Sequence, residues 1–544
     1  MKKLVSSYFF IIFYIVLISI PLLIPYFHSG YFPTHDGEWA VVRLSDMFRE
    51  LKDMQIPARF SGNLNSGYGY PLFNFAYPFP YYFGILFHIL GFSFVNTTKI
   101  LFALTIPFSA LFMFFASRNI WKNNYSGYIS AILYLYFPYR ILDLFVRGSI
   151  GESFGFMIFP LILLSVSKLI DNPKSWQFRI LGAVSFGTLI LSHNIMAVLF
   201  SLVMMFIFIA YFLMYKIKII KEFLFIYIFG FMLSAFFSIP ALLEKKNILL
   251  SVTPIADRNL YFVNFQKLIF SPWGYGTPTE ANPFTYQIGI PFLIVIFGAI
   301  FLLIYKYFKK EKNILATILL LAGIVLTVFM FKESKIVWKL PLLSEINYPW
   351  TLLSQVGLVF SVLAGFLATN KYARTISIIA VFVALFLYIP ISKPDFYVDR
   401  GEGYYFTNSA TTTSSNELMP LWVKNIPFQI PEKKVETKGI VSNLTYNSKK
   451  INFNLNLNKE EIVTINTIYY PGWKIDANGI TQKIIYDNPH GVMQIKLPKG
   501  NYEIIGRFGE TPLRLFADSI SIFSLILLLI YSVIKFKKIK LWNI

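Results

Sequence analysis

Long apolar stretches, each followed by a short polar loop, recur along almost the whole chain. Runs of roughly 17 to 22 apolar residues match the hydrocarbon core of a bilayer and exceed the usual length of a buried soluble helix. This pattern predicts a polytopic α-helical membrane protein with about twelve spans. The predicted spans are 7–27, 95–116, 125–145, 154–170, 178–192, 195–215, 223–243, 286–305, 314–331, 351–369, 376–391 and 513–534.

Lysines and arginines gather in every second loop between these spans and set the predicted orientation. Under the positive-inside rule these loops, and both chain termini, are cytoplasmic. The basic clusters are 1–3, 118–122, 168–179, 216–221, 306–312, 371–374 and 535–540. The apolar stretch 71–91 is interrupted by three prolines, so it predicts one or two helices on the outer membrane surface instead of a span.

One soluble module interrupts the spans. Residues 451–458 alternate strictly between apolar residues and asparagine, which is typical of a strand with one buried face. Further strands are predicted at 462–468, 482–486, 492–497 and 502–508, separated by Pro/Gly/Asn turns. The sequence thus predicts three parts. Residues 1–391 form a transmembrane domain with a long outer loop at 28–94. Residues 392–512 form an extracytoplasmic domain whose second half is a small antiparallel β-sandwich, and residues 513–544 form a final span with a basic tail.

Composition agrees with a membrane protein, since 56% of the residues are hydrophobic and only 14% are charged. The formal net charge of +21 would fit nucleic acid, but the basic residues lie beside hydrophobic spans, where they act as topology signals. Nucleic acid is therefore not an expected partner. Cysteine is absent, which excludes disulfides, thiolate metal sites and a cysteine nucleophile.

The loop after the first span contains an acid, Asp36, at the boundary between water and lipid. Apolar residues at helical spacing over 40–51, with charged residues on the other face, predict an interfacial helix that starts just after Asp36. A carboxylate there can deprotonate a hydroxyl acceptor, or hold a divalent cation against a phosphate leaving group. The alternative is that Asp36 caps the helix by accepting hydrogen bonds from its first free amides.

Glu38 completes an Asp-x-Glu pair with Asp36. Two such carboxylates could share a divalent cation, Mg²⁺ or Mn²⁺. Two acids in the first turn of a helix also complement its dipole, and the sequence leaves both interpretations open.

A second charged cluster is predicted at the outer ends of the third and fourth spans, and consists of Arg140, Asp143, Arg147 and Glu152. The first three are three and four positions apart, so on a helix they share one face. Charges at a membrane boundary mark either a structural ion pair or an ion or phosphate path, and the planar guanidinium suits phosphate oxygens. His193, near the outer end of the fifth span, could supply a hydrogen bond or a proton, or it could be a structural residue.

Aromatic residues in the outer loops include Trp273, Tyr348 and Trp350. Such residues normally form the aromatic belt at the membrane interface, although sugar rings also stack on them.

Several short motifs follow one another along nearly the whole chain. They are His35-Asp36, 70–78 (YPLFNFAYP), 139–148 (YRILDLFVRG), 192–194 (SHN), 347–350 (NYPW), 416–420 (NELMP) and 470–473 (YPGW). In this order they resemble the GT-C superfamily of polyprenol-dependent membrane glycosyltransferases, and more closely the YfhO-like membrane proteins and the group labelled "6-pyruvoyl-tetrahydropterin synthase-related". The chain shows no zinc-binding histidine cluster for pterin chemistry, and it has Thr351 where the resemblance leads us to expect an arginine.

The resemblance implies that a sugar is transferred, with inversion, from a polyprenyl-phosphate carrier to an envelope glycan, polymer or lipid acceptor on the outer face of a bacterial plasma membrane. It implies that Asp36 is the general base or a metal-bound acid. It also implies that Arg140 and Arg147 hold the carrier phosphate, while Asp143, Glu152 and His193 orient them or the acceptor.

Two other classes of function remain open at this stage. A transporter or flippase of a lipid-linked or sugar substrate usually shows two matching halves, whereas here no half repeats the other. A non-catalytic envelope scaffold would keep the fold and use the β-rich module to bind wall polymer.

Overall fold

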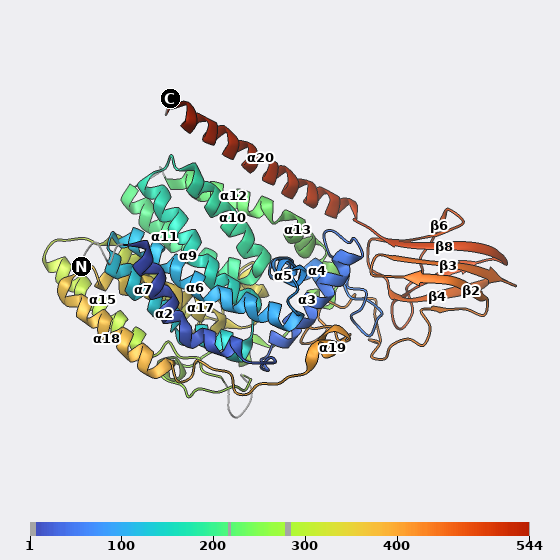
Figure 1. Cartoon of the computed structure of the whole chain (residues 1–544), viewed down its shortest axis with the longest axis horizontal. Coiled ribbons are helices and arrows are strands. Elements are labelled where there is room, and N and C mark those ends of the chain that lie inside the picture. The colour runs from blue at the N-terminus through green and yellow to red at the C-terminus, as the bar shows by residue number, and fades with distance from the viewer. Residues whose placement is uncertain (1–6, 216–218, 278–283, 543–544) are drawn as a thin grey trace.

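The computed structural model describes residues 7–215, 219–277 and 284–542, so the basic residues predicted at 1–3 and 216–218 lie outside the described residues. Figure 1 shows a bundle of long helices from one end of which two β-sheets project. The shorter helices α3, α4 and α5 lie between the bundle and the sheets. Helix α2 begins, and α20 ends, on the side of the bundle away from the sheets.

In the described part of the chain, eight helices are long and apolar enough to cross a bilayer, or up to ten spans are present if each of two bent helix pairs counts as one. The predicted count of twelve is therefore not confirmed. The other two predicted spans are helices, α10 (Trp176–Ser192) and α16 (Ile314–Val328), of only 17 and 15 residues. The eight long helices are α2 (Tyr8–Leu23, continued by η1, Ile24–Phe27), α6 (Phe94–Trp121), α9 (Ile150–Asp171), α11 (Asn194–Tyr215), α15 (Ile290–Phe308), α17 (Leu353–Leu367, preceded by η10, Pro349–Leu352), α18 (Lys371–Tyr388) and α20 (Pro512–Trp542).

The two bent pairs have identifiable breaks. Helix α7 (Asn124–Leu135) is followed, at an angle of 46°, by α8 (Pro138–Leu142) and the π-helical turn η2 (Asp143–Arg147). Proline at the first position of α8 disfavours helical backbone in the residue before it, which separates α8 from α7. Helices α12 (Ile220–Leu233) and α13 (Ala235–Leu243) meet at 76°.

Helix α17 occupies the centre of the bundle. All 15 of its residues are buried, which agrees with its nearly continuous apolar sequence. Helix α18, in contrast, has apolar side chains exposed along one side, including Phe382 and Phe386, as expected where a helix faces lipid.

The loop between α2 and α6 contains three of the short helices. Helix α3 (Gly37–Lys52) starts directly after Asp36, as predicted. Helices α4 (Leu72–Phe75) and α5 (Phe79–Ile89) confirm that the proline-interrupted stretch forms two short helices. Two further short helices lie elsewhere, α14 (Phe265–Ile269) and α19 (Gly401–Phe406).

On the charged side of α3, Asp46 and Glu50 are only 1% exposed. Gln55, from the loop after α3, donates from Nε2 to Glu50 Oε2 at 2.8 Å and to Ser448 Oγ at 3.3 Å. This side of α3 is therefore covered by its own following loop and by a turn of the β-rich region.

The β-rich region consists of two antiparallel sheets, with strand orders β1-β4-β7 and β2-β3-β8-β5-β6. The strands are β1 (Val435–Glu436), β2 (Ile440–Tyr446), β3 (Lys450–Leu457), β4 (Glu461–Ile468), β5 (Trp473–Ala477), β6 (Ile480–Gln482), β7 (Val492–Leu497) and β8 (Gly500–Phe508). Strand β3 buries alternate residues, Ile451, Phe453, Leu455 and Leu457, as its sequence predicts. The strand predicted at 482–486 is wrong, because β6 ends at Gln482 and only a single bridge, Ile485 to Gln494, follows.

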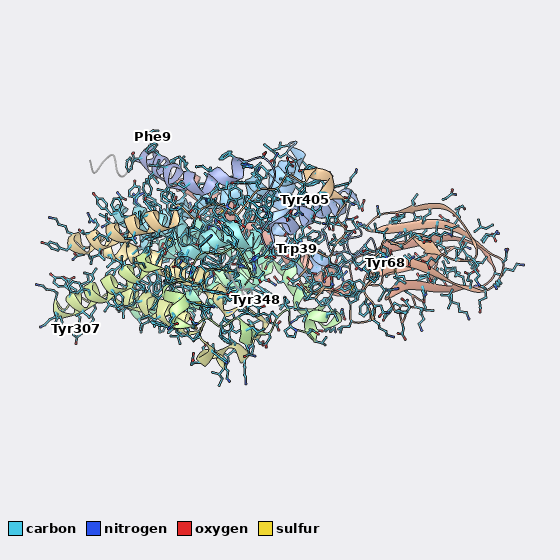
Figure 2. All side chains as sticks on the ribbon, turned by 90° about the horizontal axis from the view of Figure 1, so that it is seen from below. Phe9, Trp39, Tyr68, Tyr307, Tyr348 and Tyr405 are labelled. Carbon is cyan, nitrogen blue, oxygen red and sulfur yellow. The ribbon has the colours of Figure 1, made fainter. Side chains whose placement is uncertain are left out.

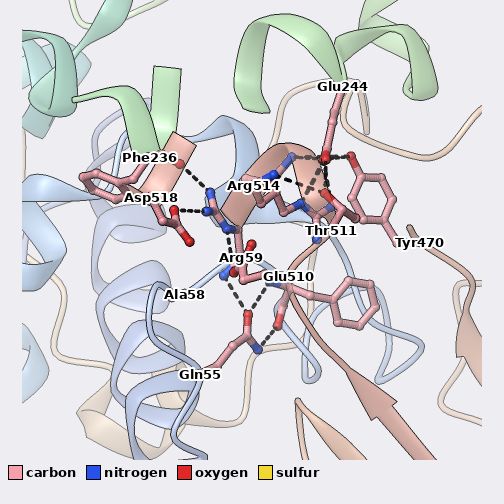
Figure 3. A network of polar contacts seen from close by, with 12 residues as sticks. Gln55, Ala58, Arg59, Phe236, Glu244, Tyr470, Glu510, Thr511, Arg514 and Asp518 are labelled. Atoms are coloured by element: carbon pink, nitrogen blue, oxygen red, sulfur yellow. Dashed lines mark hydrogen bonds and ion pairs between the residues drawn. The ribbon is translucent and has the colours of Figure 1, made fainter. Parts of the chain in front are cut away.

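A buried polar network joins the sheets to the bundle (Figure 3). Arg514, at the start of α20, donates to both carboxylate oxygens of Glu244 at 2.9 and 2.8 Å, and Tyr470 from the β-rich region donates to the same carboxylate at 3.2 Å. Arg59 pairs with Glu510 at 3.1 Å and with Asp518 at 2.8 Å. Because these residues come from four separate segments, the network fixes the sheets relative to the loop that follows α2.

Candidate functional site

The segment that contains Asp36 is bound by backbone hydrogen bonds to the end of the π-helical turn η2. The amide of His35 donates to the carbonyl of Val146 at 3.0 Å, and the amide of Asp36 donates to the carbonyl of Arg147 at 2.8 Å. Gly148 follows at φ +64°, and a Cβ atom there would lie 2.1 Å from Thr34 Oγ1. The two segments therefore approach as closely as glycine permits.

Asp36 occupies the N-cap position of α3, but within the described first turn its side chain accepts no hydrogen bond from a helix amide. Thr34 provides that contact instead, since its Oγ1 accepts from the amide of Gly37 at 2.9 Å. The interpretation of Asp36 as a helix cap is therefore wrong, and its carboxylate needs another explanation.

The carboxylate of Asp36 lies among cations. Burial raises its pKa above the usual value, and Arg147, Arg43 and His35 act in the opposite direction. A half-buried carboxylate with a raised pKa is a stronger base than an exposed aspartate.

Arg147 is held in a fixed position next to this carboxylate. Its Nη1 donates to Glu152 Oε1 and, at 2.7 Å, to Tyr139 Oη, which in turn donates to Glu152 Oε2 at 2.7 Å. The guanidinium carbon lies 4.7 Å from the centroid of the Trp350 ring. Glu152 and Trp350 thus hold Arg147 from two sides, through an ion pair and a cation–π contact.

Arg140 and Asp143 are buried and pair with each other, although Asp143 also lies close to Arg147 and Glu152. Arg140 is 0% exposed, pairs with Asp143 Oδ2 at 3.4 Å and donates to Thr105 Oγ1 at 2.7 Å. This placement contradicts the expectation that Arg140 and Arg147 hold one phosphate together. The physical reason is the π-helical turn, whose wider spacing removes the shared face that an α-helix would give them. Arg140 and Asp143 form a structural ion pair.

His193 ends α10 and stacks on Tyr77, with ring centroids 5.0 Å apart. Burial lowers the pKa of His193 to about 4, although nearby Glu152 acts to raise it. The imidazole is therefore neutral at physiological pH, and can accept or donate a hydrogen bond without carrying charge.

Glu38 does not join Asp36. Its Oε1 accepts a hydrogen bond from Tyr405 at 3.1 Å and lies 3.4 Å from Arg400 Nη1. Among the described residues no group of three or more His, Asp or Glu side chains is arranged to hold a metal ion. Glu38 is therefore not shared with Asp36, the Mg²⁺ or Mn²⁺ site stays a prediction, and no step below uses a metal.

The site has members that sequence analysis missed. Arg43 lies seven positions after Asp36, which on a helix is the same face, so the spacing could have identified it. Tyr77 comes from the YPLFNFAYP motif and lies close to Asp36, Arg43 and Glu152. We define the Asp36 cluster by residues from four segments: Asp36, Arg43, Tyr77, Arg147, Glu152 and His193.

An aromatic wall adjoins the Asp36 cluster at Arg147. The ring of Trp350 lies 5.0 Å from Phe284 and 5.4 Å from Tyr348, measured between centroids. Figure 2 shows Tyr348 in the half of the bundle that faces the β-sheets, Trp39 closer to the sheets, and Tyr68 at the junction itself. Trp350, predicted as a membrane-belt residue, is instead buried at 3% exposure against Arg147.

Comparisons with known proteins give few relatives. No family model matches the chain, so the resemblance to YfhO-like proteins is not confirmed. An uncharacterized protein of Lactococcus lactis subsp. cremoris (strain MG1363) is 23% identical over 315 residues, which cover 55% of this chain and 50% of that protein. The match thus spans about half the length of this relative.

Two solved structures of the Archaeoglobus fulgidus oligosaccharyltransferase are similar to the chain. The apo form has a TM-score of 0.42 at 13% identity and covers 78% of this chain and 62% of its own. The complex with Zn and sulfate has a TM-score of 0.43 at 14% identity, and the match covers 77% of this chain and 59% of the oligosaccharyltransferase chain. With scores this low, the proposals below depend on the residues of this chain.

Proposed function

We propose that this protein is a membrane glycosyltransferase that moves a sugar from a polyprenyl-phosphate carrier to an envelope glycan, polymer or lipid acceptor. The observation that carries the proposal is the Asp36 carboxylate, which does not cap its helix and instead faces Arg147 and Arg43. A base beside cations, at one end of an apolar bundle, suits a reaction in which a hydroxyl is deprotonated while a phosphate departs.

The proposed step is a single displacement at the anomeric carbon of the donor sugar. Asp36 accepts the proton of an acceptor hydroxyl as its oxygen forms the new bond to the anomeric carbon. The bond between that carbon and the phosphate oxygen breaks, and polyprenyl phosphate leaves with the electron pair. Attack from the face opposite the phosphate inverts the anomeric configuration.

Arg147 stabilises the charge that develops on the departing phosphate. Its guanidinium is oriented in advance by Glu152 and Tyr139, so little reorganisation is needed during the reaction. Tyr77 and the neutral His193 offer hydrogen bonds to sugar hydroxyls without adding charge. The donor lipid lies in the membrane, and the β-sheet end of the molecule faces the compartment in which the acceptor is found.

The test compares cells of the source bacterium that lack the protein with cells that express wild type, Asp36→Asn or Asp53→Asn. Asp53 ends the same helix and accepts from the amide of Ser448 at 2.9 Å, so Asp53→Asn is a matched control outside the Asp36 cluster. Lipid-linked sugars and envelope glycans are measured by mass spectrometry.

We expect Asp36→Asn to reproduce the deletion, with one glycan lost and its lipid-linked donor accumulated, while Asp53→Asn behaves as wild type. Unchanged glycans in the deletion strain would point to a scaffold. A lipid-linked sugar that accumulates only in the inner leaflet, in the deletion strain and in Asp36→Asn alike, would point to a flippase.

A further inference from the structure

The segment between α18 and the β-sheets lies across α3. We call residues 398–413 the strap. Its contacts with the loop that follows α2 are Tyr31 N to Val398 O at 2.8 Å, Val398 N to Tyr31 O at 2.7 Å, Arg49 to the carbonyl of Phe406, Ser66 N to Ser409 O at 3.0 Å, and Tyr70 Oη to Thr413 Oγ1 at 2.9 Å. The strap therefore covers the helix that contains Arg43.

Thr412 of the strap holds one edge of the Arg43 guanidinium. Arg43 Nε donates to Thr412 Oγ1 at 3.1 Å, and its Nη2 donates to the carbonyl of Thr412. Thr412 is 1% exposed and has φ +58°, a left-handed conformation that brings its hydroxyl and its carbonyl to the same arginine. Tyr81 also lies within hydrogen-bonding reach of the guanidinium, and Tyr77 and Asp36 lie close to it.

Arg43 differs in its counter-charge from Arg147 of the same cluster and from the fully buried Arg59, Arg140 and Arg514. Each of these four has a carboxylate within 3.4 Å. Among the described residues no carboxylate lies within ion-pair distance of Arg43, and both partners supplied by Thr412 are neutral. A half-buried guanidinium without a counter-ion is a site at which an anion gains stability.

We propose that Arg43 is a second phosphate-binding residue, which binds the non-bridging oxygens of the carrier phosphate from the side opposite Arg147 and is positioned for this by Thr412 of the strap. The proposal rests on the proposed function and deepens it, since it assigns a phosphate ester as the ligand of this side of the cluster. Arg43 takes the role that the sequence had given to Arg140. Asp36, which lies close to both guanidinium groups, would then be near the sugar attached to that phosphate.

The experiment measures binding without turnover. Purified full-length protein in lipid nanodiscs is titrated with radiolabelled undecaprenyl phosphate, with undecaprenol as the neutral probe and inorganic phosphate as the probe for a free anion. The variants are Arg43→Gln, Arg43→Lys, Thr412→Ala and Asp36→Asn. Arg507→Gln removes an exposed arginine of β8 and is the matched control.

We expect Arg43→Gln to weaken binding of undecaprenyl phosphate by roughly tenfold to a hundredfold, as for loss of a charge-assisted hydrogen bond. Arg43→Lys should retain part of the affinity, and Thr412→Ala should lose less than Arg43→Gln. Arg507→Gln should bind as wild type, and undecaprenol should bind equally to all variants. If the protein binds inorganic phosphate but not undecaprenyl phosphate, the ligand is a free anion, and the proposal of a lipid-carrier phosphate is wrong.

Wild-type affinity in an Arg43→Gln protein that melts at the wild-type temperature would overturn the proposal. If Arg43→Gln does not fold, the test uses Arg43→Lys and Thr412→Ala. Wild-type affinity for undecaprenyl phosphate in both of these variants would contradict a guanidinium site shaped by Thr412. Asp36→Asn should still bind the lipid phosphate. Failure of the transfer reaction and failure of phosphate binding are therefore separate results.

Discussion

The backbone amide of Asp36 donates a 2.8 Å hydrogen bond to the carbonyl oxygen of Arg147. This bond joins the proposed base and the proposed phosphate-binding cation through the main chain, although the two residues are 111 positions apart. Because no side chain takes part, substitutions at either residue leave the bond in place. The relative position of base and cation is thus set by how closely the two segments approach.

Gly148→Ala tests that approach. The added Cβ would lie 2.1 Å from Thr34 Oγ1 and 2.8 Å from the amide nitrogen of Gly37, so the two segments must separate. We expect sugar transfer to fall at least about tenfold, since small displacements of reacting groups are costly. Gly67→Ala is the control, because Gly67 has φ +79° with nothing within 4 Å of a Cβ, so it meets the same backbone strain without a clash. Equal activities of the two variants would contradict this prediction.

The dependence of transfer on pH should reflect Asp36. Burial raises its pKa, and a general base works only when ionised, so activity should rise with pH and reach half its maximum above the ordinary aspartate value of about 4. His193 has a pKa of about 4 and stays neutral, so no second transition is expected near pH 6.5. Rates in membranes between pH 4 and 9 test this. If the pH of half-maximal transfer shifts in His193→Gln but not in Asp36→Glu, the titrating group is His193 and the prediction is wrong.

Asp46 should destabilise the protein at neutral pH. It is 1% exposed, and burial raises its pKa to about 6 although Ser61 and Arg49 act to lower it. Between pH 4 and 6 the unfolded chain loses this proton and the folded chain keeps it, so stability falls as pH rises through that window.

Asp46→Asn should therefore stabilise the protein above pH 6 by on the order of 2 kcal/mol, and the gain should vanish near pH 4. Melting temperatures in detergent at pH 7.5 and pH 4.5 measure the difference. A gain of the same size at both values would show that the effect does not come from titration.

The network of Figure 3 should be required for the β-sheets to stay in place. Arg514→Met leaves the buried Glu244 carboxylate unpaired, which typically costs about 3–5 kcal/mol. The double variant Arg514→Met/Glu244→Met removes both charges and should recover much of that loss. Limited proteolysis between the sheets and α20 reports the change, and equal sensitivity of the single and double variants would contradict the account.

Much of the fold follows from local patterns in the sequence. Apolar run length predicted the long helices, and strict alternation predicted β3. The count of spans did not follow, because run length does not show that Pro138 bends one predicted span or that α16 is only 15 residues long.

The candidate site was predicted in part. Asp36, Arg147, Glu152 and His193 are brought together, but Arg140 was assigned to the same face on the assumption of regular α-helix, and the π-helical turn invalidates that spacing. Arg43 was treated only as one of the charged residues of the interfacial helix. Its position depends on contacts with Thr412, 369 positions away, and no local pattern encodes that contact.

The central claim is that Asp36 is a base and not a helix cap, and one substitution measured in two ways tests it most directly. Asparagine caps helices as well as aspartate does but cannot accept the proton. Melting temperature and sugar transfer are measured on the same preparations of wild type, Asp36→Asn and Thr34→Val. Thr34→Val removes the observed cap and should lower stability by about 0.5–2 kcal/mol. We predict that Asp36→Asn has the melting temperature of the wild type but transfers no more sugar than preparations that lack the protein. Sugar transfer at the wild-type rate by Asp36→Asn would contradict the account.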